Sequence, residues 1–185
     1  MKINPIQKFI LKDKHNLRIA ATVGDAWPEV RAQMVAGFLD RLEARLKKKL
    51  KGFQYERDGR FGIDAYPSFY FWKPAWEGQY GLCLQFGDYG ELVVMGVYRE
   101  IKRIGKRLFS EELLDAIVRH HPSARTLHPW WEARVTMQSP ATDWRKSEVL
   151  WRIKTDDTFL QEVSELLLEM AKLSEPIVDG LARKK

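Results

Sequence analysis

Residues 66–102, YPSFYFWKPAWEGQYGLCLQFGDYGELVVMGVYREIK, contain two alternating apolar runs on either side of a turn. Every second residue from Tyr80 to Phe86 is apolar, and these side chains would share one face of a strand because successive side chains point to opposite faces. Residues 87–90, Gly-Asp-Tyr-Gly, have the composition of a turn, and residues 91–102 run back. The pattern predicts an antiparallel hairpin that reverses near Tyr89, around which the other elements are arranged.

Amphipathic helices are predicted on both sides of this hairpin. In residues 25–50 an apolar side chain recurs every fourth residue from Val30, and Gly52 follows as a C-terminal stop. Ser110 begins a second helix that ends at Pro122. A third helix is expected from Thr158, with its far end limited by Pro176.

Four further runs have the pattern of strands, at residues 53–57, 66–72, 131–138 and 148–153. The short apolar run at residues 17–23 is consistent with either a strand or a helix. Helices and strands do not alternate as they would in a parallel sheet. The order therefore predicts an α+β fold, an antiparallel sheet of about five strands with helices packed mainly on one face. At this length, residues 1–185 are expected to form a single domain.

Composition sets limits on compartment and partner. The formal net charge of +6 permits an acidic partner such as nucleic acid or an acidic protein. Cys83 is the single cysteine, which excludes an intramolecular disulfide and a multi-cysteine zinc site. Because Cys83 lies in a predicted strand, we expect its side chain to be buried. Polar residues interrupt residues 1–17, so no signal peptide is expected, and no apolar run approaches membrane-spanning length. These features predict a cytoplasmic protein that makes no contact with a membrane.

The hairpin geometry brings a tryptophan-containing loop and a basic strand end to one end of the sheet. The side chains expected there are Trp72, Lys73, Trp76, Arg99, Lys102, Arg103, Lys106 and Arg107. Basic side chains neutralise phosphates and flat aromatic rings stack on bases. This surface predicts a binding module without catalytic activity, metal or cofactor that contacts nucleic acid or an acidic protein. The alternative is that the tryptophans belong to the core and the charges solvate a loop.

Glu100-Ile101-Lys102 resembles the E-x-K half of the PD-(D/E)XK nuclease motif. The resemblance implies a divalent ion such as Mg²⁺, held by an Asp and the Glu, and a Lys that orients the attacking water. Asp88 lies about 30 Å from Glu100 along an extended strand, so Glu77 would have to replace the family's Asp. The alternative function is thus a divalent-metal nuclease using Glu77, Glu100 and Lys102, with one ligand that departs from the family pattern.

A wider similarity concerns the order of elements. The helix at residues 25–50, the aromatic strand at 69–72, the hairpin arm ending at 95–99 and the final helix together resemble the C-terminal accessory region of PD-(D/E)XK nuclease-like bacterial proteins. That resemblance implies an accessory or recognition domain that lacks the nuclease core. The many aromatic residues allow a third function, a protein-interaction or self-assembly module.

Overall fold

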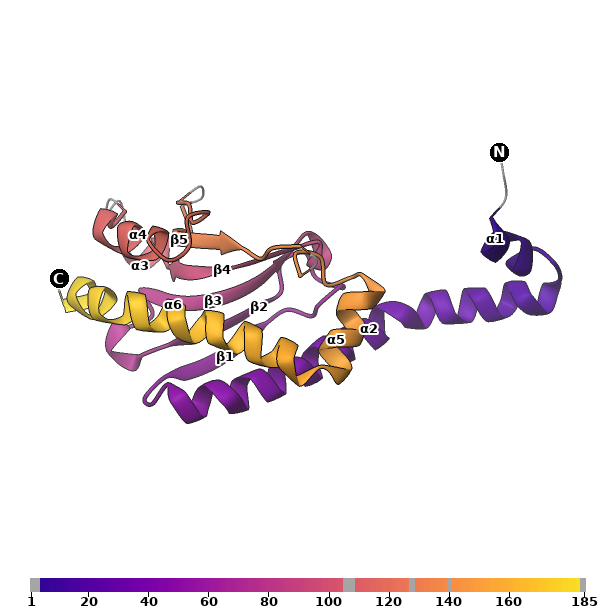
Figure 1. Cartoon of the computed structure of the whole chain (residues 1–185), viewed down its shortest axis with the longest axis horizontal. Coiled ribbons are helices and arrows are strands. Elements are labelled where there is room, and N and C mark those ends of the chain that lie inside the picture. Colours follow the sequence, from indigo (N-terminus) through magenta and orange to yellow (C-terminus); the bar gives the residue numbers. More distant parts are fainter. Residues whose placement is uncertain (1–3, 105–108, 127–128, 140, 184–185) are drawn as a thin grey trace.

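A five-stranded antiparallel sheet forms the centre of the molecule in the computed structural model, which describes residues 4–104, 109–126, 129–139 and 141–183 (Figure 1). The strands lie in sequence order and are β1 (Gln54–Asp58), β2 (Ser68–Trp72), β3 (Tyr80–Gly87), β4 (Leu92–Arg99) and β5 (Trp131–Thr136). Each strand is antiparallel to its neighbour. The predicted α+β fold with an antiparallel sheet is confirmed.

The central hairpin β3–β4 reverses where the sequence predicts. Asp88 and Tyr89 have positive φ angles of 49° and 58°, and the chain returns through the register that begins with Gly87 opposite Leu92. The strand β4 ends at Arg99, three residues before the predicted end. The Glu100 N–H donates to the carbonyl of Gln79 at 2.8 Å, so the pairing extends one residue beyond Arg99.

Helices cover one face of the sheet. The three that form this layer are α2 (Lys14–Lys49), α5 (Ser147–Thr155) and α6 (Asp157–Arg183), and α4 (Glu111–Val118) packs against α6 and β5 (Figure 1). The short helices are α1 (Pro5–Ile10), η1 (Pro74–Trp76), η2 (Asp88–Gly90) and α3 (Ile101–Ile104). The prediction that helices lie mainly on one face therefore holds for the described residues.

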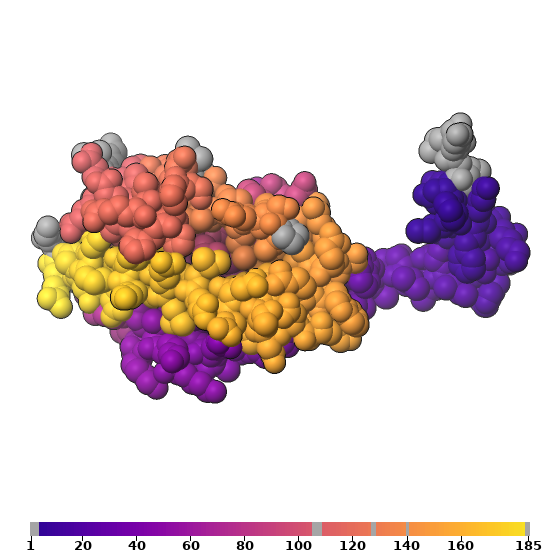
Figure 2. All heavy atoms as spheres, in the orientation of Figure 1, coloured from indigo at the N-terminus to yellow at the C-terminus, as the bar shows by residue number. Residues whose placement is uncertain are grey.

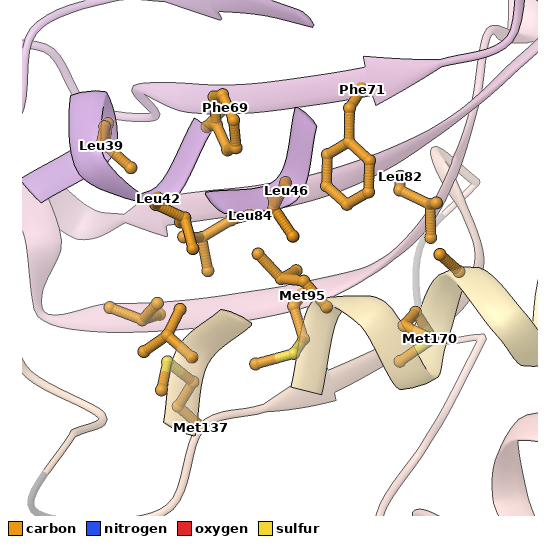
Figure 3. Close-up of a cluster of buried hydrophobic side chains, with 14 of the residues drawn as sticks. Leu39, Leu42, Leu46, Phe69, Phe71, Leu82, Leu84, Met95, Met137 and Met170 are labelled. Atoms are coloured by element: carbon orange, nitrogen blue, oxygen red, sulfur yellow. The ribbon is translucent and has the colours of Figure 1, made fainter. Parts of the chain in front are cut away.

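The hydrophobic core lies between this helical layer and the sheet. Alternate residues of each strand point inward, because side chains in a strand alternate between faces. Figure 3 shows side chains of β2, β3 and β4 meeting those of α2 and α6. The buried residues labelled there are Leu39, Leu42, Leu46, Phe69, Phe71, Leu82, Leu84, Met95, Met137 and Met170. Cys83 points to the opposite face of the sheet and is buried as a free thiol, as predicted.

Two predicted helices are longer than the sequence pattern suggests. The first begins at Lys14, where the Asp13 carboxylate accepts the Asn16 N–H at 2.9 Å, so Pro28 lies inside the helix. The last helix continues through Pro176, which removes one backbone donor. The later residues Val178, Leu181 and Ala182 are buried, and their packing offsets that loss.

The prediction of a strand at residues 148–153 is wrong. This segment is part of α5, in which Val149, Leu150 and Ile153 are buried and Trp151 is exposed. Spacings of one and four residues place the buried side chains on one side of a helix. A short apolar run of this kind does not distinguish a helix from a strand by its pattern alone.

The N-terminal part of the chain projects from the body of the molecule (Figures 1 and 2). We call residues 4–31, which comprise α1 and the first half of α2, the arm. Within the arm only Asn16 is buried, and its side-chain amide donates to the carbonyl of Phe9 at 2.8 Å, which joins α1 to α2. No helix in the described part of the chain combines the length and the apolar character that crossing a membrane requires.

Candidate functional site

The loop after β2 and the segment after β4 meet at one end of the sheet, as the hairpin geometry predicts. The Arg103 guanidinium donates to the carbonyl of Glu77 at 2.5 Å. It also lies over Gly78, where an added Cβ would be 2.8 Å from the Arg103 Nη1 atom. The structure thus brings together the two segments on which the predicted binding surface depends.

Two of the residues predicted for that surface are instead used inside the fold. Trp76 is 0% exposed, and its indole N–H donates to the Asp179 carboxylate at 2.7 Å. Lys73 donates to the same carboxylate at 2.9 Å and lies 2.5 Å from the Glu175 carboxylate. These contacts attach η1 to the C-terminal part of α6. The expectation that Trp76 offers an exposed ring for base stacking is wrong, because both faces of the ring are covered.

Arg99 is also inside the molecule. It is 3% exposed, and its Nη1 atom lies 3.2 Å from the Glu132 carboxylate. Its guanidinium carbon is 4.7 Å from the centre of the Phe109 ring. A buried cation paired in this way is not available to a phosphate, since breaking the pair would leave Glu132 buried and uncompensated.

The remaining predicted contacts lie at the surface or outside the described residues. Lys102 and Arg103 are exposed on α3, and Trp72 is half-buried at the end of β2. Lys106 and Arg107 lie outside the described residues.

The Glu100-Ile101-Lys102 motif does not have the geometry expected from the nuclease resemblance. Residues 101–104 form α3, so Lys102 lies on a helix after β4, and the prediction that the return strand extends to residue 102 is wrong. The Glu100 carboxylate accepts the Tyr98 hydroxyl at 3.0 Å and the backbone N–H of Lys102 at 3.1 Å. Among the residues that the structure describes, no group of three His, Cys, Asp or Glu side chains is placed to hold a metal ion. These residues therefore do not fit the Mg²⁺ site that the resemblance implies.

Glu77 and Glu100 do share a groove on the open face of the sheet, which the helices leave uncovered. The register places Trp72 beside Gly81 and Tyr98, and the next row contains Tyr70, Cys83 and Gly96. Small residues on β3 thus lie between aromatic residues on β2 and β4. They leave a groove of about 590 Å³. Its lining residues are Gln54, Glu56, Asp58, Tyr70, Trp72, Pro74, Glu77, Gly78, Tyr80, Gly81, Tyr98, Glu100 and Arg103.

Aromatic residues of β2 and β4, Tyr70, Trp72 and Tyr98, line this groove. The rings of Tyr70 and Tyr98 are 5.5 Å apart at 63°, an edge-to-face arrangement. Burial raises the pKa of Tyr70 to about 12. Burial, together with the hydrogen bond to Glu100, raises the pKa of Tyr98 further. Both phenols therefore keep their protons at neutral pH, and neither adds negative charge to the groove.

The charge of the groove is negative. Glu56 and Asp58 stand on the edge strand β1, Glu77 on the loop after η1, and Glu100 after β4, whereas Arg103 is the cation among the described lining residues. The sequence analysis did not identify Glu56, Asp58, Tyr70 or Tyr98 as site residues. The available signal was the period-two pattern of residues 54–58, which places Glu56 and Asp58 on the same face of one strand.

Comparisons with protein-family models, with curated proteins and with solved structures gave no match to this chain. The resemblance to the accessory region of PD-(D/E)XK nuclease-like proteins therefore stays a prediction.

Proposed function

We propose that this protein is a non-catalytic interaction module whose open-face groove binds a cationic segment of a protein. The observation that carries this proposal is the set of four carboxylates, Glu56, Asp58, Glu77 and Glu100, around the half-buried rings of Tyr70, Trp72 and Tyr98. We refer to this site as the acidic-aromatic groove.

The chemistry of the groove favours a cation over a phosphate. A Lys or Arg side chain gains from the negative face of an aromatic ring, by about 0.5–1 kcal/mol at exposed sites. Nearby carboxylates add to this attraction, and the same carboxylates repel phosphate groups. A basic protein segment therefore fits the groove better than the backbone of a nucleic acid.

The position of the groove also limits how the ligand binds. It lies on the open face across β1 to β4, and the backbone groups of β2 and β3 there pair with the neighbouring strands. A ligand in the groove cannot add to the sheet as another strand. Recognition therefore depends on the side chains of the ligand.

The proposal is tested by fluorescence anisotropy with a labelled dodecapeptide of lysine and leucine, compared with a peptide in which glutamate replaces each lysine. Wild type should bind the lysine peptide only. The double variant Glu56→Lys, Asp58→Lys should bind it about tenfold more weakly, because two exposed attractions become repulsions. The matched control is Asp115→Lys, Glu165→Lys, which makes the same charge change at exposed positions on α4 and α6.

The control variant should bind the lysine peptide as wild type does. Equal affinity for both peptides, or equal loss in both double variants, would show that the groove does not select cations.

Contact with nucleic acid is a second candidate function. It is supported by Lys102 and Arg103, which are exposed on α3, and by Arg103 and Trp72 lining the same groove. Replacing Arg103, Lys106 and Arg107 by Glu should abolish a gel shift that weakens with added salt. Unchanged binding by that variant would exclude this surface.

A further inference from the structure

The arm exposes more large apolar side chains than any other part of the described chain. Eight of the fourteen exposed large hydrophobic residues lie between residues 6 and 30. They are Ile6, Phe9, Leu11, Leu17, Ile19, Val23, Trp27 and Val30, with exposed fractions from 40% to 70%. A concentration of this kind marks an interaction surface.

The arm is also basic near its tip. Residues 4–24 contain the cations Lys8, Lys12, Lys14 and Arg18 and a single acidic residue, Asp13. The Asp13 carboxylate is occupied as the cap of α2. The tip therefore combines exposed apolar side chains with a positive charge, which complements both the aromatic rings and the carboxylates of the acidic-aromatic groove.

The arm cannot reach the groove of its own chain. Trp76 attaches η1, beside the groove, to Asp179 near the C-terminal end of α6. Figure 1 shows that this end of α6 and the arm lie at opposite extremities of the long axis of the molecule. An arm that fills the groove of one copy must therefore belong to another copy.

We propose that the acidic-aromatic groove of one copy receives the arm of a second copy. This inference rests on the function proposed above and names the cationic segment that the groove binds. It explains two surfaces with one contact, since exposed apolar side chains on the arm cover the half-buried aromatic rings of the groove. The lysines of the arm then lie against Glu56, Asp58 and Glu100.

The contact is heterologous, because the arm of one copy meets a different surface of the next. Such contacts produce closed rings or open chains of copies. The average mass of the protein in solution should therefore rise with concentration beyond that of a dimer if open chains form. If closed rings form, the mass should stop rising at the mass of one ring. Sedimentation velocity over a concentration series measures this directly.

A mixing experiment tests the two surfaces separately. The arm variant is Lys8→Glu, Lys12→Glu, Arg18→Glu, and the groove variant is Glu56→Lys, Asp58→Lys. Each alone should associate about tenfold more weakly than wild type, since several exposed attractions become repulsions. Mixed together, the two variants should associate again as wild type does, because the intact arm meets the intact groove and the Glu-bearing arm meets the Lys-bearing groove. A single chain with all five changes should regain self-association, because both charges are exchanged.

Each outcome separates this inference from the proposed function. A wild type that stays monomeric, or a groove variant that associates as wild type does, would overturn the inference even if the lysine peptide still binds the groove. Loss of association only in the arm variant would indicate pairing of two arms. If the lysine peptide does not bind but the mixed variants associate, the groove recognises the arm without a general preference for cations.

Discussion

The close approach of β4 and β5 at Gly96 gives the sharpest test of the described sheet. Arg134 directs its backbone N–H and C=O to Arg125, each at 2.9 Å. Gly96 and Arg134 are therefore a non-hydrogen-bonded pair, the pair type with the shorter separation between Cα atoms. An added Cβ at Gly96 would lie 2.1 Å from the carbonyl oxygen of Ala133 and 2.7 Å from the Cα of Arg134. Both contacts are with backbone atoms, which cannot rotate away as a side chain can.

The change Gly96→Ala should therefore separate the two strands locally. The Cβ must move from 2.1 Å to an ordinary contact distance of at least 3.4 Å. Overpacking costs about 1–3 kcal/mol, and each flanking hydrogen bond that is weakened adds about 1 kcal/mol. The free energy of unfolding should fall by about 3 kcal/mol, which lowers the urea midpoint by about 1.5 M for an m-value near 2 kcal/mol per M.

Gly81→Ala is the matched control, because Gly81 lies on the same open face. Its added Cβ would meet the nearest atoms, the Phe71 carbonyl oxygen and the Trp72 Cβ, at 3.7 Å and 3.8 Å. Replacing a strand glycine by alanine without a clash should raise stability by about 0.5–1 kcal/mol. Urea unfolding followed by tryptophan fluorescence measures both variants. If Gly96→Ala unfolds at the same midpoint as Gly81→Ala, the described pairing of β4 with β5 is wrong.

Three further predictions concern the groove and its anchor. Trp72→Ala should weaken binding of the lysine peptide about threefold to fivefold in anisotropy, by loss of one cation–π contact. Self-association should weaken when salt is raised from about 0.1 M to about 1 M, because the Debye length falls from about 10 Å to about 3 Å; sedimentation that is independent of salt would contradict a charged contact. Burial raises the pKa of Asp179, but the Trp76 indole and the Lys73 ammonium lower it more, so its folded pKa is below the ordinary 3.8. The contribution of Asp179 to the free energy of unfolding is present above pH 4 and is lost as pH falls through the folded pKa. Urea unfolding of the Asp179→Asn variant should lack this loss of stability in acid.

The sheet could be predicted because its residues follow a rule that depends only on neighbours in the sequence. Alternation in residues 80–86 and the Gly-Asp-Tyr-Gly turn determine the hairpin and which side chains share a face. The end of β4 could not be predicted, since α3 begins where Arg103 folds back onto Glu77 and Gly78. Such a contact joins residues far apart in the sequence and leaves no periodic signal.

The helix boundaries were predicted less well for a related reason. Pro28 and Pro176 indicate helix ends by their local chemistry, yet both lie inside helices. In α6 the tertiary packing of Val178 and Leu181 outweighs one missing hydrogen bond. In residues 148–153 the apolar pattern fits a strand as well as a helix. The two structures are distinguished only by tertiary packing, which buries Val149 and Ile153 on one side of α5.

Net charge was the least informative guide to the site. The chain carries +6 overall, yet the charged residues that line the groove are four carboxylates and one arginine, whereas residues 4–24 of the arm carry four cations and one carboxylate. The cations of one arm and the carboxylates in the groove of another copy attract each other before the two surfaces touch, which orients the copies. That attraction mainly increases the rate of association, whereas the apolar contacts of Phe9 and Leu11 with the aromatic rings would slow dissociation. Salt should therefore reduce the association rate of the mixed arm and groove variants and leave their dissociation rate nearly unchanged.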